Sequence, residues 1–442
     1  MRSVLASFVL GLRAPFRSRL VAAMLVLLGA TILLLPTHLQ SDGTSEGMLR
    51  MVLSWTLGPV SVLLGVSTLW AACSSISGEI EGKRFLGTAI SPAGRFAVCL
   101  GRWLGLVALD AALLFVALTG VYLQARHNVP DSKARAVRRL VEMDPVGLEA
   151  ETDRIFAYAF PNGVESDRVP GIRAAIRADL EGSTHLQIGP GQERHWIFPM
   201  EDPHTADADL SFHYLSSYGS AQGIRGTLTV LNQTGGTIAE IELTNDDHGT
   251  CGVMLDDKDL ADVTRLEVVF KNLENEDTGA AILVNHVSAI RLTVPGGGLG
   301  MNLVRTGWSL LAVFALLAAL GLASGCAFSF PVAAFVATGL CAMVLASGNS
   351  VYTDTATVAA HEHGHGPQGA FSRRVESFSR HVSSGFNAVT APIAETRALD
   401  RLGDGLAISG KSVMAAVVLD GIAVPLVLLF LGAVALRRRE FP

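Results

Sequence analysis

The stretch "MVLSWTLGPVSVLLGVSTLWAA", residues 51–72, is a continuous apolar run without a charged side chain. As a helix rising about 1.5 Å per residue, it is long enough to cross the roughly 30 Å hydrocarbon core of a bilayer. Five further apolar blocks have comparable length: residues 20–36, 103–123, 303–323, 328–347 and 412–436. The sequence therefore predicts a membrane α-helical bundle of six transmembrane helices.

The composition agrees with this class. The chain has 442 residues, of which 50% are hydrophobic, and its mean hydropathy of +0.40 is too high for an ordinary soluble protein. The net charge of −6 arises in the polar middle, and no basic stripe with interleaved aromatic residues is present. We therefore expect no nucleic acid partner. Cys251 is the single cysteine of the polar middle, which excludes a disulfide within it.

Lysine and arginine gather in residues 1–19, in the link 74–102 and in the tail "RRREFP". Short loops rich in lysine and arginine stay on the cytoplasmic side of the membrane, so both termini and the link are predicted to be cytoplasmic. Residues 1–19 also carry an apolar stripe at helical spacing, Leu5, Val9, Leu12 and Phe16. This stripe favours an amphipathic helix in contact with membrane lipid over a segment that only leads into the first span.

The polar middle, residues 124–300, is predicted to be an extracytoplasmic domain. Its start, through "KARAVRRLVEM", is predicted to be helical. From about residue 185 to 295, short runs such as "LSFHYLS" and "TRLEVVFKN" alternate with turns, which indicates seven or eight strands. This pattern predicts an antiparallel β-sandwich of jelly-roll type. Its aromatic residues, Trp196, Phe198, Phe212 and Tyr214, are expected in the core rather than on a ligand-binding face.

A second outer region, residues 351–411, contains "HEHGHG". His361, His363 and His365 are candidate metal ligands by composition, although an exposed polar loop is the commoner interpretation of such a tract. Apolar residues at helical spacing predict one helix near residues 371–382 and another that runs into the last span.

The predicted organisation is 1–19, the interfacial helix; 20–123, spans one to three with the link 74–102; 124–300, the β-rich domain; 303–347, spans four and five; 351–411, the outer loop with helices; and 412–442, span six and the basic tail.

The stretch "GLAISGKS", residues 405–412, fits the nucleotide-binding pattern G-x-x-x-x-G-K-[ST]. Its setting argues against that function, because a polar helical stretch precedes it and a transmembrane helix follows it. On the predicted outer side, Lys411 needs no nucleotide, since a lysine at this boundary can reach the lipid headgroups. We therefore expect no ATPase within this chain.

The link 74–102 contains a Glu-x-Glu pair, "GT" at residues 87–88, Ser91–Pro92, Arg95 and "GRWLG" at residues 101–105. It resembles the coupling helix of type-2 ABC exporter permeases. "SGCAFSFPVAAFVATGL", residues 324–340, resembles the second, shorter cytoplasmic contact of that family. Within this family, the chain resembles gliding-motility permeases and the permease linked to nitrous oxide reductase maturation. The large domain between spans three and four departs from both, so the substrate stays open.

This resemblance implies a bacterial inner-membrane permease subunit, itself not an enzyme and without a cofactor, because ATP is bound by a partner. The expected partners are a cytosolic ABC ATPase, a second identical or related permease chain, and a cell-envelope component or ligand of the outer domain. The residues implied in ATPase contact are Glu79, Glu81, Lys83, Arg84, Pro92, Arg95, Ser324 and Phe328. Two alternatives stay open: charges that merely solvate the link, and a membrane-anchored binding or assembly module without transport.

Two acidic residues lie inside predicted spans, Asp110 and Asp420. An ionised carboxylate at the centre of a bilayer costs about 2.5–3.5 kcal/mol even on the lenient insertion scale, so both are expected to face the bundle interior or water. They are candidates for a polar translocation path. The equally weighted alternative is a near-interface carboxylate that finds a hydroxyl group or water.

Overall fold

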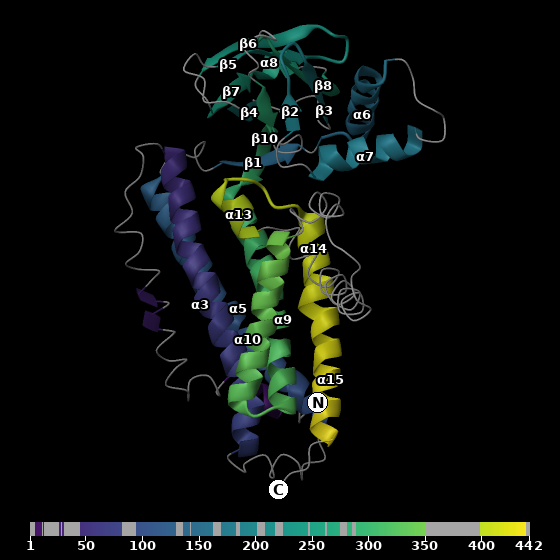
Figure 1. The fold of residues 1–442 in the computed structure, drawn as a ribbon. Coiled ribbons are helices and arrows are strands. Elements are labelled where there is room, and N and C mark those ends of the chain that lie inside the picture. Colours follow the sequence, from purple (N-terminus) through teal and green to yellow (C-terminus); the bar gives the residue numbers. More distant parts are fainter. Residues whose placement is uncertain are drawn as a thin grey trace. The chain divides into compact units, whose positions relative to one another are not determined.

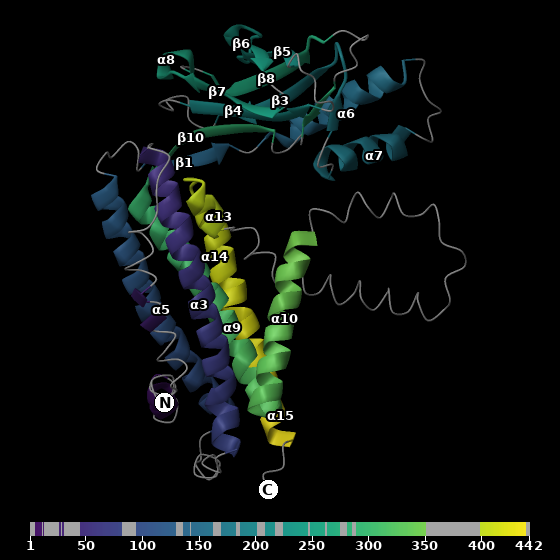
Figure 2. The same cartoon turned by 60° about the vertical axis from the view of Figure 1, so that its left-hand side comes forward.

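The structure is a computed structural model (Figures 1 and 2). The residues that it describes are 5–10, 12, 26, 27, 29, 30, 45–81, 94–129, 136–141, 143–161, 169–182, 186–200, 208–216, 224–245, 248–260, 263–274, 281–284, 289–350 and 398–438. They form two compact units, a helical unit and a β unit that covers residues 138–296.

The helical unit contains α3 (Ser45–Glu81), α5 (Arg95–Asn128), α9 (Leu299–Ala327), α10 (Phe330–Ser350), α13 (Ala398–Gly403), α14 (Gly410–Val418), η1 (Leu419–Ala423) and α15 (Val424–Arg438). Within the described residues, four helical stretches are long and apolar enough to cross a membrane: Leu49–Glu81, Arg95–His127, Leu299–Ala327 and Gly410–Arg438. They correspond to predicted spans two, three, four and six. Predicted span five is α10, whose apolar stretch Phe330–Ala342 is shorter. Predicted span one lies almost entirely outside the described residues, although residues 5–10 before it are helical.

Helix α9 is the central helix of this unit and contacts α3, α5 and α15 (Figures 1 and 2). Two glycines one turn apart allow its close approach to α3. A Cβ at Gly325 would lie 2.6 Å from the carbonyl oxygen of Cys73, and one at Gly321 would lie 2.7 Å from that of Leu69. Such small-residue contacts are the usual way in which membrane helices bring their backbones together.

Both predicted links are shorter than the sequence indicated. Helix α3 continues to Glu81 and α5 begins at Arg95, so residues 74–81 and 95–102 of the predicted link are helical. Helix α9 extends to Ala327, which places Ser324 in its last turn and leaves residues 328–329 as the turn before α10. Apolar side chains continue beyond each predicted span end and pack within the bundle, which extends the helices.

The predicted helix running into span six is interrupted. Helix α13 ends at Gly403, and Gly405 follows with a φ of +72°, a left-handed conformation that favours glycine. The chain then stays non-helical until α14 begins at Gly410. The apolar stripe that suggested a continuous helix is instead divided between α13 and the segment 405–409.

The β unit has ten strands among its described residues. They are β1 (Ala136–Val141), β2 (Leu186–Ile188), β3 (Glu193–Pro199), β4 (Ala208–Ser216), β5 (Ile224–Leu231), β6 (Thr237–Asn245), β7 (His248–Leu255), β8 (Arg265–Asn272), β9 (Ile282–Val284) and β10 (Ile290–Gly298). One sheet has the order β1-β10-β4-β9-β2, with β7 paired to β4, and the other has the order β3-β8-β5-β6. Strand β4 runs antiparallel to β10, β7 and β9, and β9 runs antiparallel to β2. In the second sheet, all neighbouring strands are antiparallel. Helices α6 (Pro145–Ala159), α7 (Val169–Gly182) and α8 (Asp257–Leu260) complete the unit.

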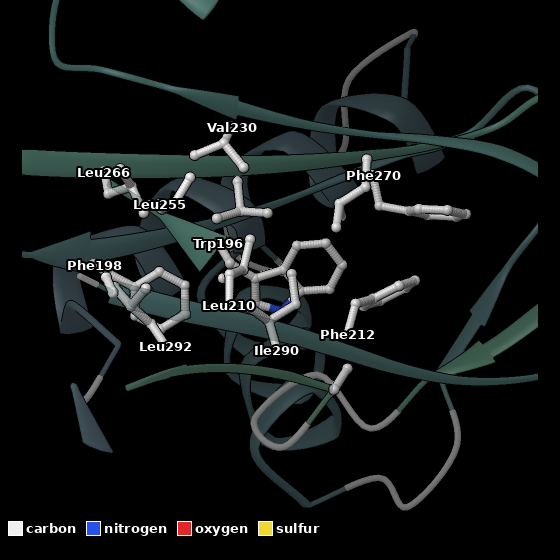
Figure 3. Packing of buried hydrophobic residues seen from close by; sticks show 14 of the residues in the cluster. Trp196, Phe198, Leu210, Phe212, Val230, Leu255, Leu266, Phe270, Ile290 and Leu292 are labelled. Carbon is white, nitrogen blue, oxygen red and sulfur yellow. The ribbon is translucent and has the colours of Figure 1, made fainter. Parts of the chain in front are cut away.

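One hydrophobic core receives side chains from both sheets (Figure 3). Alternate residues point inward, as period-two strands require: Trp196 and Phe198 from β3, and Phe212 and Tyr214 from β4. All four are at most 4% exposed, which confirms the prediction that these aromatic residues belong to the core. Gly226 lies beneath a fifth aromatic ring, because a Cβ there would come within 2.6 Å of Phe270.

Two predictions for this unit were wrong or incomplete. Residues 136–141, within the predicted helix "KARAVRRLVEM", form β1 and pair with β10. Helix-forming side chains are a weak local preference, and pairing with a long neighbouring strand overrides it. Strand β7 was not anticipated, because its sequence "HGTCGVML" contains two glycines that weaken a strand pattern.

Candidate functional site

The described ends of the two predicted coupling links lie within one end of the helical unit. The link leaves α3 at Glu81 and enters α5 at Arg95, while Phe328 separates α9 from α10. Glu81 is exposed, and Phe328 is 43% exposed. Lys83, Arg84 and Pro92 lie outside the described residues.

Arg102 is the central charge of this region, and its side chain is only 2% exposed. Its guanidinium group forms an ion pair with Glu79 and donates to the backbone oxygen of Ser75, so it joins α5 to α3. Its Nε has no hydrogen-bond partner within the described part of the chain. A buried charge is tolerated only when it is paired, so Glu79 has a structural role in addition to any contact with a partner.

Glu81 joins the first link to the second. Its Oε1 accepts a hydrogen bond of 3.0 Å from the backbone N–H of Phe330, the first residue of α10. The first N–H groups of a helix lack partners within the helix and carry partial positive charge, so a carboxylate there is favourable. The sequence pattern placed Glu79 and Glu81 in one loop. In the structure, Glu79 pairs with Arg102, whereas Glu81 accepts from the N–H of Phe330.

Helix α5 also contacts α9 beside this region. The Sγ atoms of Cys99 and Cys326 lie 3.8 Å apart, and both side chains are buried. One turn further, Trp103 donates from Nε1 to the backbone oxygen of Ala315 at 2.8 Å. The helix ends that flank the two links therefore form one connected assembly of α3, α5, α9 and α10.

The sequence pattern did not single out Arg102 as a site residue. It appeared as one of several topology-setting charges, although its position within the apolar run "CLGRWLG" is a signal for an internal partner. The sequence could not indicate Ser75, because its contact with Arg102 uses the backbone oxygen, which every residue has.

The two intramembrane aspartates have different surroundings. Asp110 on α5 is 4% exposed and accepts a hydrogen bond of 2.7 Å from Thr68 on α3, while its Oδ2 has no partner among the described residues. Asp420 is fully buried in η1, a π-helical segment packed on α9. Both therefore face the bundle interior, as expected. Asp110 acts as a polar contact between helices, and a π-helical turn is a frequent companion of functional residues.

The stretch 405–412 has its own structural explanation. Asn302 on α9 donates to the backbone oxygen of Leu406 at 2.9 Å and accepts from the N–H of Ile408 at 2.8 Å. Arg305 donates to the oxygen of Ile408 at 3.0 Å. The bond from Ile408 uses a backbone N–H that a phosphate cradle would have to leave free, and Lys411 is exposed in the first turn of α14.

The candidate metal ligands His361, His363 and His365 lie outside the described residues. Within the part of the chain that the structure describes, no group of three or more histidine, cysteine or acidic side chains could hold a metal ion.

The β unit contains a buried charge cluster between α6 and β3. Glu151 is 1% exposed, and its carboxylate lies 3.5 Å from Arg194 and 3.6 Å from Arg154. Burial raises the pKa of Glu151, although both arginines oppose that shift. Next to it, Nδ1 of His195 lies 2.9 Å from Glu267. Arg154 also lies 3.5 Å from Glu267 on β8, so these contacts hold α6 against β3 and β8.

Comparison with protein-family models finds none that matches this chain. Comparison with curated proteins finds no significant match either.

Proposed function

We propose that this chain is the permease subunit of an ATP-driven exporter of the ABC class and that it couples to a separate cytosolic ATPase. The proposal rests on the resemblance of the link 74–102 and residues 324–340 to type-2 exporter permeases. It includes six spans in a bacterial inner membrane, cytoplasmic termini, and a second permease chain. The β unit is then extracytoplasmic.

The observation that carries this proposal is the hydrogen bond between Glu81 and the N–H of Phe330. An ATPase that pushes on a loop moves the membrane helices only if the loop is attached rigidly to them. Glu81 attaches the end of α3 to the start of α10, and Arg102 attaches α3 to α5. Movement imposed on residues 82–94 would thus reach three helices together rather than dissipate in one flexible link.

The strand order supports a jelly roll for the β unit. Strands β2, β9, β4 and β7 follow one another in one sheet, and β3, β8, β5 and β6 in the other. These two interleaved sets of four strands are typical of a sandwich of two Greek keys, and β10 and β1 are additional strands of the first sheet. In the proposal, this unit binds an envelope component or a ligand outside the membrane.

The proposal is tested by affinity purification of the tagged full-length chain from membranes of its native host, followed by mass spectrometry. We expect a copurifying protein with a true P-loop ATPase sequence. The double variant Lys83→Glu/Arg84→Glu should lose this partner and keep its elution profile. The matched control Lys271→Glu, in the β unit, should retain it. Recovery of the chain without an ATPase, including after chemical crosslinking in the membrane, would refute the permease function.

A second function is favoured by one observation. The β unit has its own buried core, so it can fold and act independently of the helices. A membrane-anchored binding or assembly module would need only this unit. That function predicts purification with an envelope partner that survives the Lys83→Glu/Arg84→Glu change and is lost when residues 138–296 are removed.

A further inference from the structure

An open pocket of about 560 Å³ lies between α3 and α13, within the helical unit. Helix α3 contributes Arg50, Ser54 and Gly58 at four-residue spacing, which places them on one face. Helix α13 contributes Asp400, and Asp404 follows four residues later, just beyond the end of that helix. The volume is within the range of about 300–1,000 Å³ that small-molecule sites occupy.

The pocket is an open groove between α3 and α13. At Gly403 the two helices almost touch, because a Cβ there would lie 2.4 Å from the Oγ of Ser54. At Gly58, which also lines the pocket, a Cβ would have no atom within 4 Å, so space remains. Trp55, Met51 and Leu399 supply the apolar part of the lining.

The charged part of the lining lies at the end of α13. The Nε of Arg50 lies 4.0 Å from the Cβ position of Gly405, so the guanidinium group covers the turn that follows Asp404. Within the described part of the chain, Arg50, Asp400 and Asp404 form no side-chain hydrogen bond or ion pair with one another or with other residues. One cation and two anions therefore face the groove with their charges available to a ligand.

The position of the groove along α3 indicates which ligand is at hand. The spanning stretch Leu49–Glu81 has 33 residues. It is about 50 Å long, which exceeds the roughly 30 Å hydrocarbon core. Arg50 is in the first turn of this stretch, so with α3 across a bilayer it would lie outside the hydrocarbon core, near the lipid headgroups. Trp55 is 59% exposed, and tryptophan is enriched at this depth of the membrane.

We propose that this groove binds the headgroup of a zwitterionic aminophospholipid of the phosphatidylethanolamine class. Arg50 would bind the phosphate, and Asp400 with Asp404 would bind the ammonium group. The apolar side chains around Trp55 would contact the glycerol and the first acyl carbons. This inference requires only that α3 spans the membrane and is independent of any ATPase partner.

The test is calorimetric titration of diheptanoyl phosphatidylethanolamine into delipidated full-length protein in detergent. We expect saturable binding, with phosphatidylglycerol of the same chain length at least about tenfold weaker, because it lacks the ammonium group. Arg50→Ala and Asp404→Asn should each weaken binding by about tenfold or more. Lys411→Ala, which removes an exposed cation of the same unit outside the groove, should have no effect.

Gly58→Leu separates occupancy of the groove from loss of charge. Its Cβ would enter open space, with no atom within 4 Å, so we expect the fold to persist while lipid binding falls by about tenfold or more. Equal affinity for the two lipids, or unchanged binding by Gly58→Leu, would overturn the proposal. Free phosphoethanolamine that binds as tightly as the lipid would also overturn it and would indicate a soluble phosphoamine ligand.

Discussion

The carboxylate of Glu81, the last residue of α3, accepts a 3.0 Å hydrogen bond from the N–H of Phe330, the first residue of α10. The two residues are 249 positions apart in the chain. This contact connects the end of α3 with the start of α10. The sequence relates these two segments only because each resembles one of the two cytoplasmic contacts of the exporter permeases.

Replacement of Glu81 by alanine should lower the stability of the helical unit by about 0.5–1 kcal/mol, because it removes an acceptor at a helix N-terminus; the loss is small because Glu81 is exposed to solvent. Glu81→Gln should have a smaller effect, since its amide oxygen still accepts the bond. Thermal unfolding of the full-length protein in detergent measures both. An unchanged melting temperature for Glu81→Ala would contradict the capping role, and Lys411→Ala is the neutral control.

The Arg102–Glu79 pair should respond asymmetrically to mutation. Glu79→Ala leaves the buried guanidinium group without its counter-charge, whereas Arg102→Met leaves a carboxylate that is already 32% exposed. We expect a loss of about 2–3 kcal/mol for Glu79→Ala and a smaller loss for Arg102→Met. Denaturation of both variants in the same detergent tests this order, and the reverse order would show that the guanidinium group of Arg102 is accessible to solvent.

Cys99 and Cys326 should form an intramolecular disulfide when membranes are treated with copper phenanthroline, because their Sγ atoms are 3.8 Å apart. Peptide mass spectrometry should recover the joined Cys99 and Cys326 peptides, and Cys99→Ser should abolish this product. A dominant crosslink from either residue to Cys341 on α10 would be incompatible with the packing of α5 on α9.

Gly325→Leu should destabilise the bundle by about 1–3 kcal/mol or more, because its Cβ would meet the Cys73 backbone and force α9 away from α3. The matched control is Gly339→Leu on α10, where no atom lies within 4 Å of the Cβ position. Expression level and thermal unfolding of both variants provide the comparison. Similar losses at both positions would argue against close α3–α9 packing.

The β unit should lose stability in mild acid through His213. Its Nδ1 lies 2.8 Å from the Oγ1 of Thr250, and partial burial of this largely exposed side chain, with Arg291 nearby, lowers the pKa of His213. The unfolded chain therefore takes up a proton first, so stability is complete above the ordinary pKa of about 6.5 and falls as the pH drops from there to the folded pKa. Unfolding of the full-length chain at pH 7.5 and 5.5, followed by the β-sheet band of its infrared spectrum, measures this, and His213→Gln should reduce the difference.

Much of the β unit could be predicted from the alternation of apolar and polar residues, because successive side chains of a strand point to opposite faces of the sheet. Phe212 illustrates this, since it lies between the polar residues Ser211 and His213 and belongs to the core. Strand β1 could not be predicted in this way. Its residues have no strand pattern, and its partner β10 is far away in the sequence.

The sequence by itself determined that the chain has helices of membrane-spanning length and a β-rich region with an aromatic core, because apolar length and alternation are local properties. Only the tertiary structure decided that Arg102 bonds to the end of α3, that Glu81 bonds to α10, and that Asn302 holds the segment 405–409. The physical reason is that a buried charge or backbone group must find a partner. Which partner it finds depends on how distant helices pack, and no local pattern records that.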